Sequence, residues 1–293
     1  MIKINCSSTI KKLAYRVVCF MALSIVYFSC GQEESINQDV ALMTDTEIQD
    51  IALKHNDALA YVLEGLKNKK ATMDLNEENF SDVVNIELHN YYKTIYVSQN
   101  ELLSTADNFS QHGVSKYLKY SNSGALLKLN TELTPIESTV DEFGDYLSAN
   151  QISLLLQCDQ ALKSAENNIA GTIMELDRIH KSAKENLTAE EAQVILIGVE
   201  IGKASLKYWD ENFDQWQEVI SPANSEQART QGWFSGSELV GADVAGGVGA
   251  AVTTVIVNAA PGAGQIAYGT AILAGAAGTS AADAVIQVWN HFF

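Results

Sequence analysis

Apolar residues recur at intervals of three and four along most of the chain, with charged and polar residues between them. This spacing is typical of amphipathic helices, because residues three and four apart share one helical face. The three prolines, Pro135, Pro222 and Pro261, each lie at the start of an expected helix or at a break. The pattern therefore predicts an all-α fold, an antiparallel helical bundle with long helices.

Four expected helix starts carry a capping box, in which the first side chain and a Glu or Gln three residues later satisfy free backbone N–H groups. The pairs are Thr44–Glu47, Thr134–Glu137, Ser148–Gln151 and Thr188–Glu191. Early helices are expected at 45–66 and 77–103, with polar connectors at 67–76 and 104–124. Residues 123–133 fit a loop or a short helix.

The clearest periodicity lies between Ser148 and Leu187 and predicts one long helix with a coiled-coil-like seam. Its seam positions are Leu155, Cys158, Leu162, Ala165, Ile169, Thr172, Leu176 and Ile179. A second helix is expected from Ala189 to Ile220, and the short break before it makes the two antiparallel neighbours. We therefore expect four or five helices to form a bundle domain over 45–220.

The composition changes after this domain. Residues 221–238 are rich in Ser, Asn, Gln and Gly and indicate a linker, and residues 244–282 contain no charged side chain. A turn is expected at 258–262, so residues 239–293 are predicted to form a Gly/Ala-rich helical hairpin. Small residues recur every fourth position, which lets helix backbones approach closely. The three series are Ala242, Gly246 and Ala250; Ala267, Ala271 and Gly275; and Ala274, Gly278 and Ala282.

These series resemble the glycine-zipper regions of small membrane-active bacteriocins and of some bacterial envelope proteins. The resemblance implies contact with a membrane or with partner helices. Each arm has about the minimum length of a membrane span. The six strongly apolar residues of the first arm contribute roughly −2 to −4 kcal/mol to insertion, and its glycines and threonines offset much of this. Paired insertion and packing against the bundle both remain open.

The amino end combines four basic residues with an apolar run from Val17 to Phe28, the layout of a secretory signal. The run is too short to span a membrane as a helix, which needs roughly 20 residues. The stretch Tyr27-Phe28-Ser29-Cys30 resembles a lipobox, the motif at which bacterial lipoproteins are cleaved and lipidated. The resemblance implies a signal peptide at 1–29, lipid on Cys30 and a tether at 30–44.

The residues after Cys30 carry information on location through the same resemblance. Gly31 is not the aspartate that retains some lipoproteins at the inner membrane, which favours the outer membrane of the cell envelope. The run Gln32-Glu33-Glu34 is similar to the acidic patch that directs some lipoproteins to the outer face. Surface exposure is the expectation that follows.

The net charge of the chain is −17, and removal of residues 1–29 makes it four units more negative. Such a surface repels phosphates, so no nucleic-acid partner is expected. Membrane attachment is expected through the lipid and, in one alternative, through the hairpin. The sequence indicates no particular protein partner.

Candidate chemistry is sparse, and we predict no enzymatic activity, no cofactor and no metal. The five histidines show no metal-ligand spacing. Asp177 and His180 lie three residues apart on one expected helix, and this pair is expected to be a surface contact. Cys158 is expected to be a small core residue. A GxGxxA pattern at 262–267 lacks the parallel sheet of a dinucleotide site. The row Trp209, Phe213 and Trp216 fits the core better than a ligand platform.

Three functional hypotheses follow. The first is a non-enzymatic envelope lipoprotein, a helical bundle anchored by lipid on Cys30 with a carboxyl-terminal hairpin for membrane or partner-helix contact. The alternative is a membrane-active surface or secreted effector, bacteriocin-like or pore-forming, in which the bundle shields the hairpin until a target is met. The third is a binding module for a carbohydrate or another envelope polymer.

Overall fold

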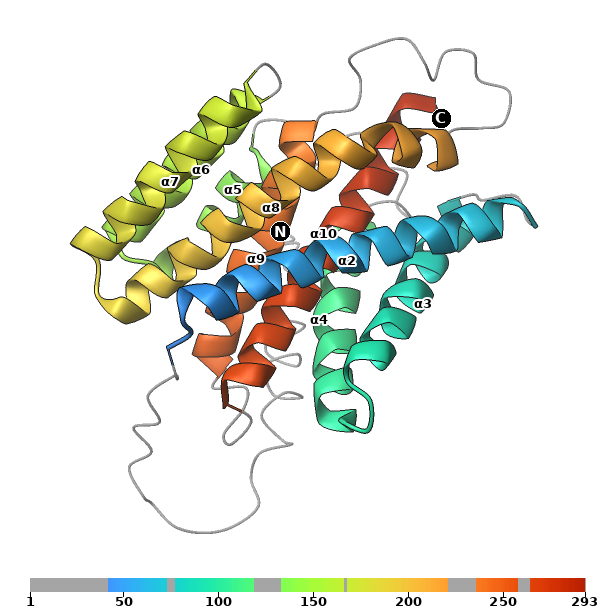
Figure 1. The fold of residues 1–293 in the computed structure, drawn as a ribbon, viewed down its shortest axis with the longest axis horizontal. Helices are drawn as coiled ribbons and strands as arrows, with labels where there is room; N and C mark the ends of the chain where they lie inside the picture. Colours follow the sequence, from blue (N-terminus) through green and yellow to red (C-terminus); the bar gives the residue numbers. More distant parts are fainter. Residues whose placement is uncertain are drawn as a thin grey trace, which may run out of the picture. The chain divides into compact units, whose positions relative to one another are not determined.

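The computed structural model describes residues 42–72, 77–118, 133–165, 168–220, 236–257 and 264–292. These residues form nine α-helices and one short 3-10 helix, with no strand among them (Figure 1). Residues 40–293 make one compact unit. The predicted all-α helical bundle is therefore confirmed. The predicted signal peptide, Cys30 and most of the tether lie outside the described residues, as do 123–132 and the turn at 258–262.

The helices follow one another in the order α2 (Asp45–Lys70), α3 (Glu77–Ile95), α4 (Asn100–Leu118), α5 (Pro135–Phe143), η4 (Gly144–Tyr146), α6 (Ala149–Lys163), α7 (Ile169–Asn186), α8 (Ala189–Ile220), α9 (Gly236–Val257) and α10 (Gly264–Phe292). All four predicted capping boxes are formed, with both reciprocal hydrogen bonds in each. The starts of α2, α5, α6 and α8 are therefore fixed by local sequence.

The expected helix at 77–103 is wrong, because the chain makes two helices there. α3 ends at Ile95 and α4 begins at Asn100, and between them Ser98 has a positive φ of 61°. This left-handed conformation ends a helix and turns the chain. α4 then occupies much of the expected connector at 104–124, and α2 extends four residues into the connector at 67–76.

The expected long helix between Ser148 and Leu187 is also wrong. The chain breaks between Lys163 and Ile169, where the Asn168 side chain caps α7 by accepting a hydrogen bond from the Gly171 N–H at 2.9 Å. α6 and α7 then lie side by side (Figure 1). The seam residues are still buried or packed on the core, because both helices present them inward.

The Gly/Ala-rich helices lie inside the bundle rather than apart from it. α9 contacts α8, α10 and α5, while α10 contacts α4, α9, α2 and α3. Every residue from Ala267 to Gln287 is buried. α9 begins at Gly236, three residues before the expected start of the hairpin at 239. The predicted bundle domain and the predicted hairpin thus belong to one unit, with α10 at its centre (Figure 1).

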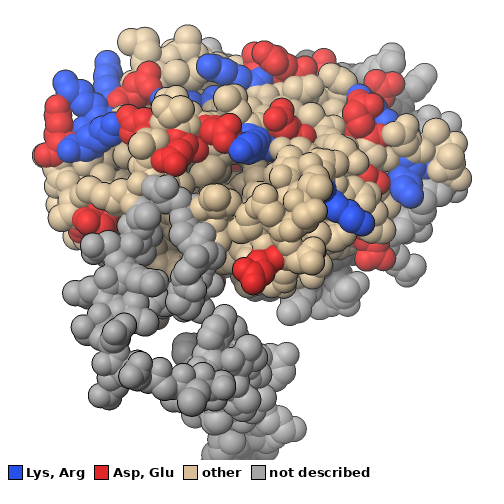
Figure 2. Space-filling view, turned by 60° about the horizontal axis from the view of Figure 1, so that its bottom comes forward, with Lys and Arg blue, Asp and Glu red and all other residues tan. Residues whose placement is uncertain are grey.

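Most charged side chains lie on the outside of this unit, and a few carboxylates are buried. On the face drawn in Figure 2, acidic and basic residues are interspersed, with uncharged areas between them. The amphipathic helices supply this exterior and leave the centre to the two apolar helices. The site that sets this molecule apart from an ordinary bundle is therefore its centre.

Candidate functional site

Two described helices are long and apolar enough to cross a membrane, judged by length and composition alone. They are Gly236–Val255 and Ile266–Gln287, of 20 and 22 residues. The core helix of a soluble protein has the same properties, and here 72% and 100% of the two segments are buried. The structure thus presents these helices as the core of the bundle, and we treat their packing as the candidate site.

α9 and α10 approach each other most closely at Gly246 and Gly275. A Cβ atom on Gly246 would lie 2.5 Å from the Gly275 carbonyl oxygen, and one on Gly275 would lie 2.7 Å from the Ala250 Cβ. Real Cβ atoms do not approach so closely, so these positions admit only glycine without a shift of the helices. The structure brings members of the first two predicted series, Gly246, Ala250 and Gly275, into one contact.

The opposite side of α10 packs equally closely on α4. A Cβ atom on Gly278 would lie 2.5 Å from the Ser110 carbonyl oxygen, and one on Gly113 would lie 3.0 Å from the Thr279 backbone nitrogen. Gly278, from the third predicted series, therefore faces α4 and not α9. Sequence reasoning missed the α4 half of this contact, although Ala106, Ser110 and Gly113 carry the same small-residue signal.

The alanines of the three predicted series are all buried in the described structure. They are Ala242, Ala250, Ala267, Ala271, Ala274 and Ala282.

α8 completes the enclosure of α9 with a different kind of contact. Cβ atoms on Gly198 and Gly202 would lie 3.0 and 3.2 Å from side-chain methyl groups of Val248 and Val244. Valines of α9 therefore fill the space above two glycines of α8, as a ridge fits a groove. α9 is held between α8 and α10 by shape and by apolar contact.

A cluster of buried polar side chains also links α9 to the bundle. The Asp243 carboxylate on α9 accepts hydrogen bonds from the Ser205 hydroxyl and, at 3.1 Å, from the Trp209 indole N–H of α8. His55 on α2 places Nε2 3.2 Å from Asp243 Oδ1. Asp243, His55 and Ser205 have no exposed surface. We call these four residues the Asp243 cluster.

A second buried carboxylate, Asp283, lies on α10. Its only described hydrogen bond comes from the Gln287 amide at 2.8 Å. Burial raises the pKa of Asp283 from 3.8 to about 7. The hydrogen bond from Gln287 lowers this pKa, and the charges of Glu238 and Asp243 raise it by smaller contributions. A carboxyl group in an apolar core resists ionisation in this way because desolvation penalises the charged form.

Sequence reasoning missed both carboxylates as site residues. A signal was present, because Asp243 and Asp283 bracket the uncharged run of 244–282 and each falls on an otherwise apolar helix. Their partners were not predictable from spacing alone, since His55 and Ser205 come from helices far away in the sequence.

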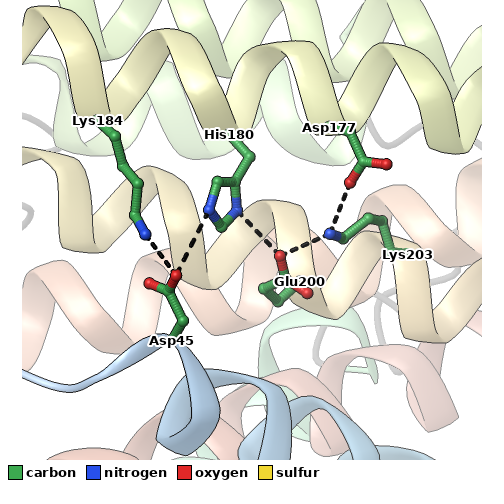
Figure 3. A network of polar contacts seen from close by, with 6 residues as sticks. All are labelled: Asp45, Asp177, His180, Lys184, Glu200 and Lys203. Carbon is green, nitrogen blue, oxygen red and sulfur yellow. Dashed lines mark hydrogen bonds and ion pairs between the residues drawn. The ribbon is translucent and has the colours of Figure 1, made fainter.

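A partly buried polar network joins the start of α2 to α7 and α8 (Figure 3). His180 Nδ1 lies 3.0 Å from Glu200 Oε1, and Lys203 bridges Glu200 and Asp177 at 2.6 and 2.9 Å. Asp45 pairs with Lys184 and lies 4.0 Å from His180 Nε2. Asp177 and His180 thus bind different partners, in contacts that hold helices together. Within the described ranges, no group of three ligating side chains could hold a metal ion.

Other candidate residues prove to be core residues. Cys158 is buried, and burial raises the pKa of its thiol to about 12, which makes it a poor nucleophile. Trp209 and Trp216 are buried, and Phe213 packs against the core. α9 precedes the GxGxxA pattern as a helix, so the strand that a dinucleotide site requires is not formed there.

One open pocket lies between the start of α2 and the start of α10, with a volume of about 190 Å³. Ile51, Tyr96 and Ile266 line it together with charged residues of α2. Ligand pockets usually enclose about 300–1,000 Å³, so this one is small for a ligand site.

Comparison of the chain with protein-family models, with curated proteins and with solved structures gives no match. Three physical features of the described residues therefore indicate what the chain does. These are a central hairpin of membrane-span length, its small-residue contacts and its two buried carboxylates.

Proposed function

We propose that the chain is a non-enzymatic envelope lipoprotein, anchored by lipid on Cys30, whose Gly/Ala-rich hairpin contacts a membrane or a partner helix when it leaves the bundle. The observation that carries the proposal is the enclosure of α9 and α10. Two segments with the length and composition of membrane spans form the centre of a unit with a charged exterior. The location in the outer membrane, exposed on its surface, belongs to the same proposal.

The composition of the hairpin supports a role beyond filling a core. Ordinary bundle cores gain stability from Leu, Ile and Phe, which bury more apolar area than Ala and Gly. α10 instead presents Ala, Gly, Thr and Ser to its neighbours over most of its length. Such surfaces let backbones approach closely without large side chains, and they suit helix packing in lipid as well as in water.

The anchor is tested with the single substitution Cys30→Ser, because the thiol of Cys30 is the proposed acceptor of lipid. In cells, the unchanged chain should incorporate a labelled fatty acid and sediment with membranes. Cys30→Ser should lose the label and accumulate uncleaved, with Cys19→Ser as a matched control that changes neither result. Equal labelling of the two variants would refute the anchor.

The hairpin contact is tested by flotation of the unlipidated chain, residues 31–293, with liposomes. Gly278→Ala loosens the packing of α10 on α4, whereas Gly241→Ala adds a methyl group that meets only ordinary contacts 3.8 Å from Pro135. Gly278→Ala should float to a greater extent than the unchanged chain or Gly241→Ala. If a loosened but folded Gly278→Ala variant stays at the bottom, membrane contact by the hairpin is wrong and a partner helix is the remaining target.

The second candidate is a membrane-active effector, and the same enclosure favours it. In this alternative the amphipathic helices shield the hairpin until it meets a target membrane. Dye release from the liposomes of the flotation experiment separates the two. Binding with leakage supports an effector, whereas binding without leakage supports an anchor or a docking element.

A further inference from the structure

The hydrogen bonds of Asn56 show where the neighbouring His55 ring carries a hydrogen. Asn56, next to His55 on α2, donates from Nδ2 to the Ala204 carbonyl oxygen at 2.9 Å. A carbonyl oxygen only accepts, so this bond fixes the orientation of the Asn56 amide. Asn56 Oδ1 then faces His55 Nδ1 at 3.0 Å as an acceptor. His55 Nδ1 must therefore carry a hydrogen.

The other ring nitrogen of His55 has a different neighbour. Nε2 lies 3.2 Å from Asp243 Oδ1, and neither atom has another hydrogen-bond partner. If His55 were neutral with its hydrogen on Nδ1, Nε2 would present a lone pair to a carboxylate oxygen. Two bare acceptors facing each other in a fully buried site are strongly unfavourable. A proton between Nε2 and Oδ1 removes the conflict.

We propose that His55 and Asp243 together hold one proton more than a neutral histidine and an ionised aspartate, and that this shared proton fastens α9 to α2. Asp243 Oδ2 is already occupied by the donors Ser205 and Trp209. Only Oδ1 is therefore open to the shared proton. A proton on Nε2 makes the two side chains an ion pair, and a proton on Oδ1 makes them a neutral pair. We call this hydrogen-bonded pair, in either form, the latch.

The other titratable groups around the cluster make this proton necessary. Tyr208 on α8 and Asp283 on α10 both interact electrostatically with Asp243, and Glu238 on α9 acts on Asp283. All three are neutral or negative, so none of them compensates the charge of Asp243. His55 on α2 is the basic group that the structure places beside this carboxylate.

The latch makes stability depend on pH in a defined direction. An unfolded histidine loses its proton near pH ~6.5, and an unfolded aspartate near pH ~3.9. Above about pH 6.5 the folded pair holds one proton and the unfolded pair holds none. The folding equilibrium constant then falls about tenfold for each unit of rising pH, until the folded pair loses its proton.

Asp243→Asn provides a sharp test, because its amide keeps an acceptor for Ser205 and Trp209 and offers a covalently fixed N–H to His55 Nε2. The unlipidated chain 31–293 is used, and both proteins carry Asp283→Asn so that Asp283 does not titrate. Denaturant unfolding at pH 7.5, 8.25 and 9 should show the tenfold loss per unit in the reference protein and a smaller loss in Asp243→Asn. Equal slopes would overturn the proposal.

Asp243→Leu serves as the matched control because it removes acceptor and donor together. It should be less stable than Asp243→Asn at every pH, and equal instability of the two would also overturn the proposal. If the variants do not fold, ring-nitrogen and carboxyl NMR shifts of the unchanged chain at pH 7.5 decide the question. A neutral His55 beside an ionised Asp243 contradicts the shared proton, and any state with the additional proton supports it.

The latch is independent of the proposed function, because it is measured in solution without a membrane. Its failure would leave the flotation experiment unaffected. If both hold, flotation should increase with pH above 7.5 in the reference protein and less so in Asp243→Asn. The shared proton would then regulate how readily the hairpin leaves the bundle.

Discussion

Gly241 and Gly278 are both buried glycines of the central helices, yet their surroundings differ. A methyl group on Gly278 would meet the backbone of Ser110 at 2.5 Å, whereas one on Gly241 would meet Pro135 at 3.8 Å. Backbone cannot move aside as a flexible side chain can. The same chemical change therefore tests the close contact in one position and helix propensity in the other.

We expect Gly278→Ala to lower the free energy of unfolding by about 1–3 kcal/mol, the usual cost of overpacking. Gly241→Ala should raise it by up to about 1 kcal/mol, because alanine favours the helix over glycine. Chemical denaturation of the two variants and the unchanged chain measures both values. Two stabilising results would mean that α4 and α10 are not in close contact.

Asp283 makes the stability of the fold depend on pH in the opposite direction to a carboxylate whose pKa is lowered by folding. Its pKa is raised from 3.8 to about 7 by burial, so the folded chain binds a proton that the unfolded chain releases. The contribution of Asp283 to the free energy of unfolding is therefore highest below about pH 4. It falls as the pH rises towards 7, by at most about 4 kcal/mol. Asp283→Asn should remove this fall and raise the melting temperature at pH 8. A lower melting temperature there would show that the carboxylate is stabilising.

At this scale the sequence allowed the small-residue positions to be predicted but not their neighbours. Four-residue spacing identified Gly246, Gly275 and Gly278, because spacing along one helix is a local property. Which helix each one faces depends on tertiary packing. The Asp243 cluster was out of reach for the same reason, since it joins residues of α2, α8 and α9.

Among the elements, the helix starts with a capping box and the break before α8 were predictable, whereas two other breaks were not. A capping box is encoded within four residues, so all four starts were found. The breaks at Ser98 and Asn168 depend on single residues whose neighbours continue the helical periodicity. α4 was missed because its buried residues, apart from Val114, are the small Ala106, Ser110 and Gly113, which do not give a strong apolar pattern.

The break between α3 and α4 offers a test at the level of the element. Ser98 adopts a φ of 61°, which costs a residue with a Cβ roughly 1 kcal/mol more than glycine. Ser98→Gly should therefore raise the free energy of unfolding by about 0.5–1 kcal/mol, with Ser98→Ala as a control that keeps the strain. If Ser98→Gly were destabilising, the chain would not turn at this residue as described.

For the whole molecule, the position of α10 implies that bundle and hairpin fold as one cooperative unit. A chain of residues 31–235 lacks both central helices and leaves the buried faces of α4 and α8 without partners. We expect it to show no cooperative thermal transition by circular dichroism, whereas residues 31–293 should show a single one. A cooperative transition in the shorter chain would restore the separate bundle domain that the sequence suggested.

The order of the elements also affects how such a protein is made. α10, the last of the described helices, contacts α2, the first of them, as well as α3 and α4. Because these contacts join distant parts of the chain, the bundle cannot close until α10 has emerged. If the chain is exported as proposed above, this delay keeps it unfolded while it passes through a narrow secretion channel. The carboxyl-terminal position of the core would then act as a timer that postpones folding until export is complete.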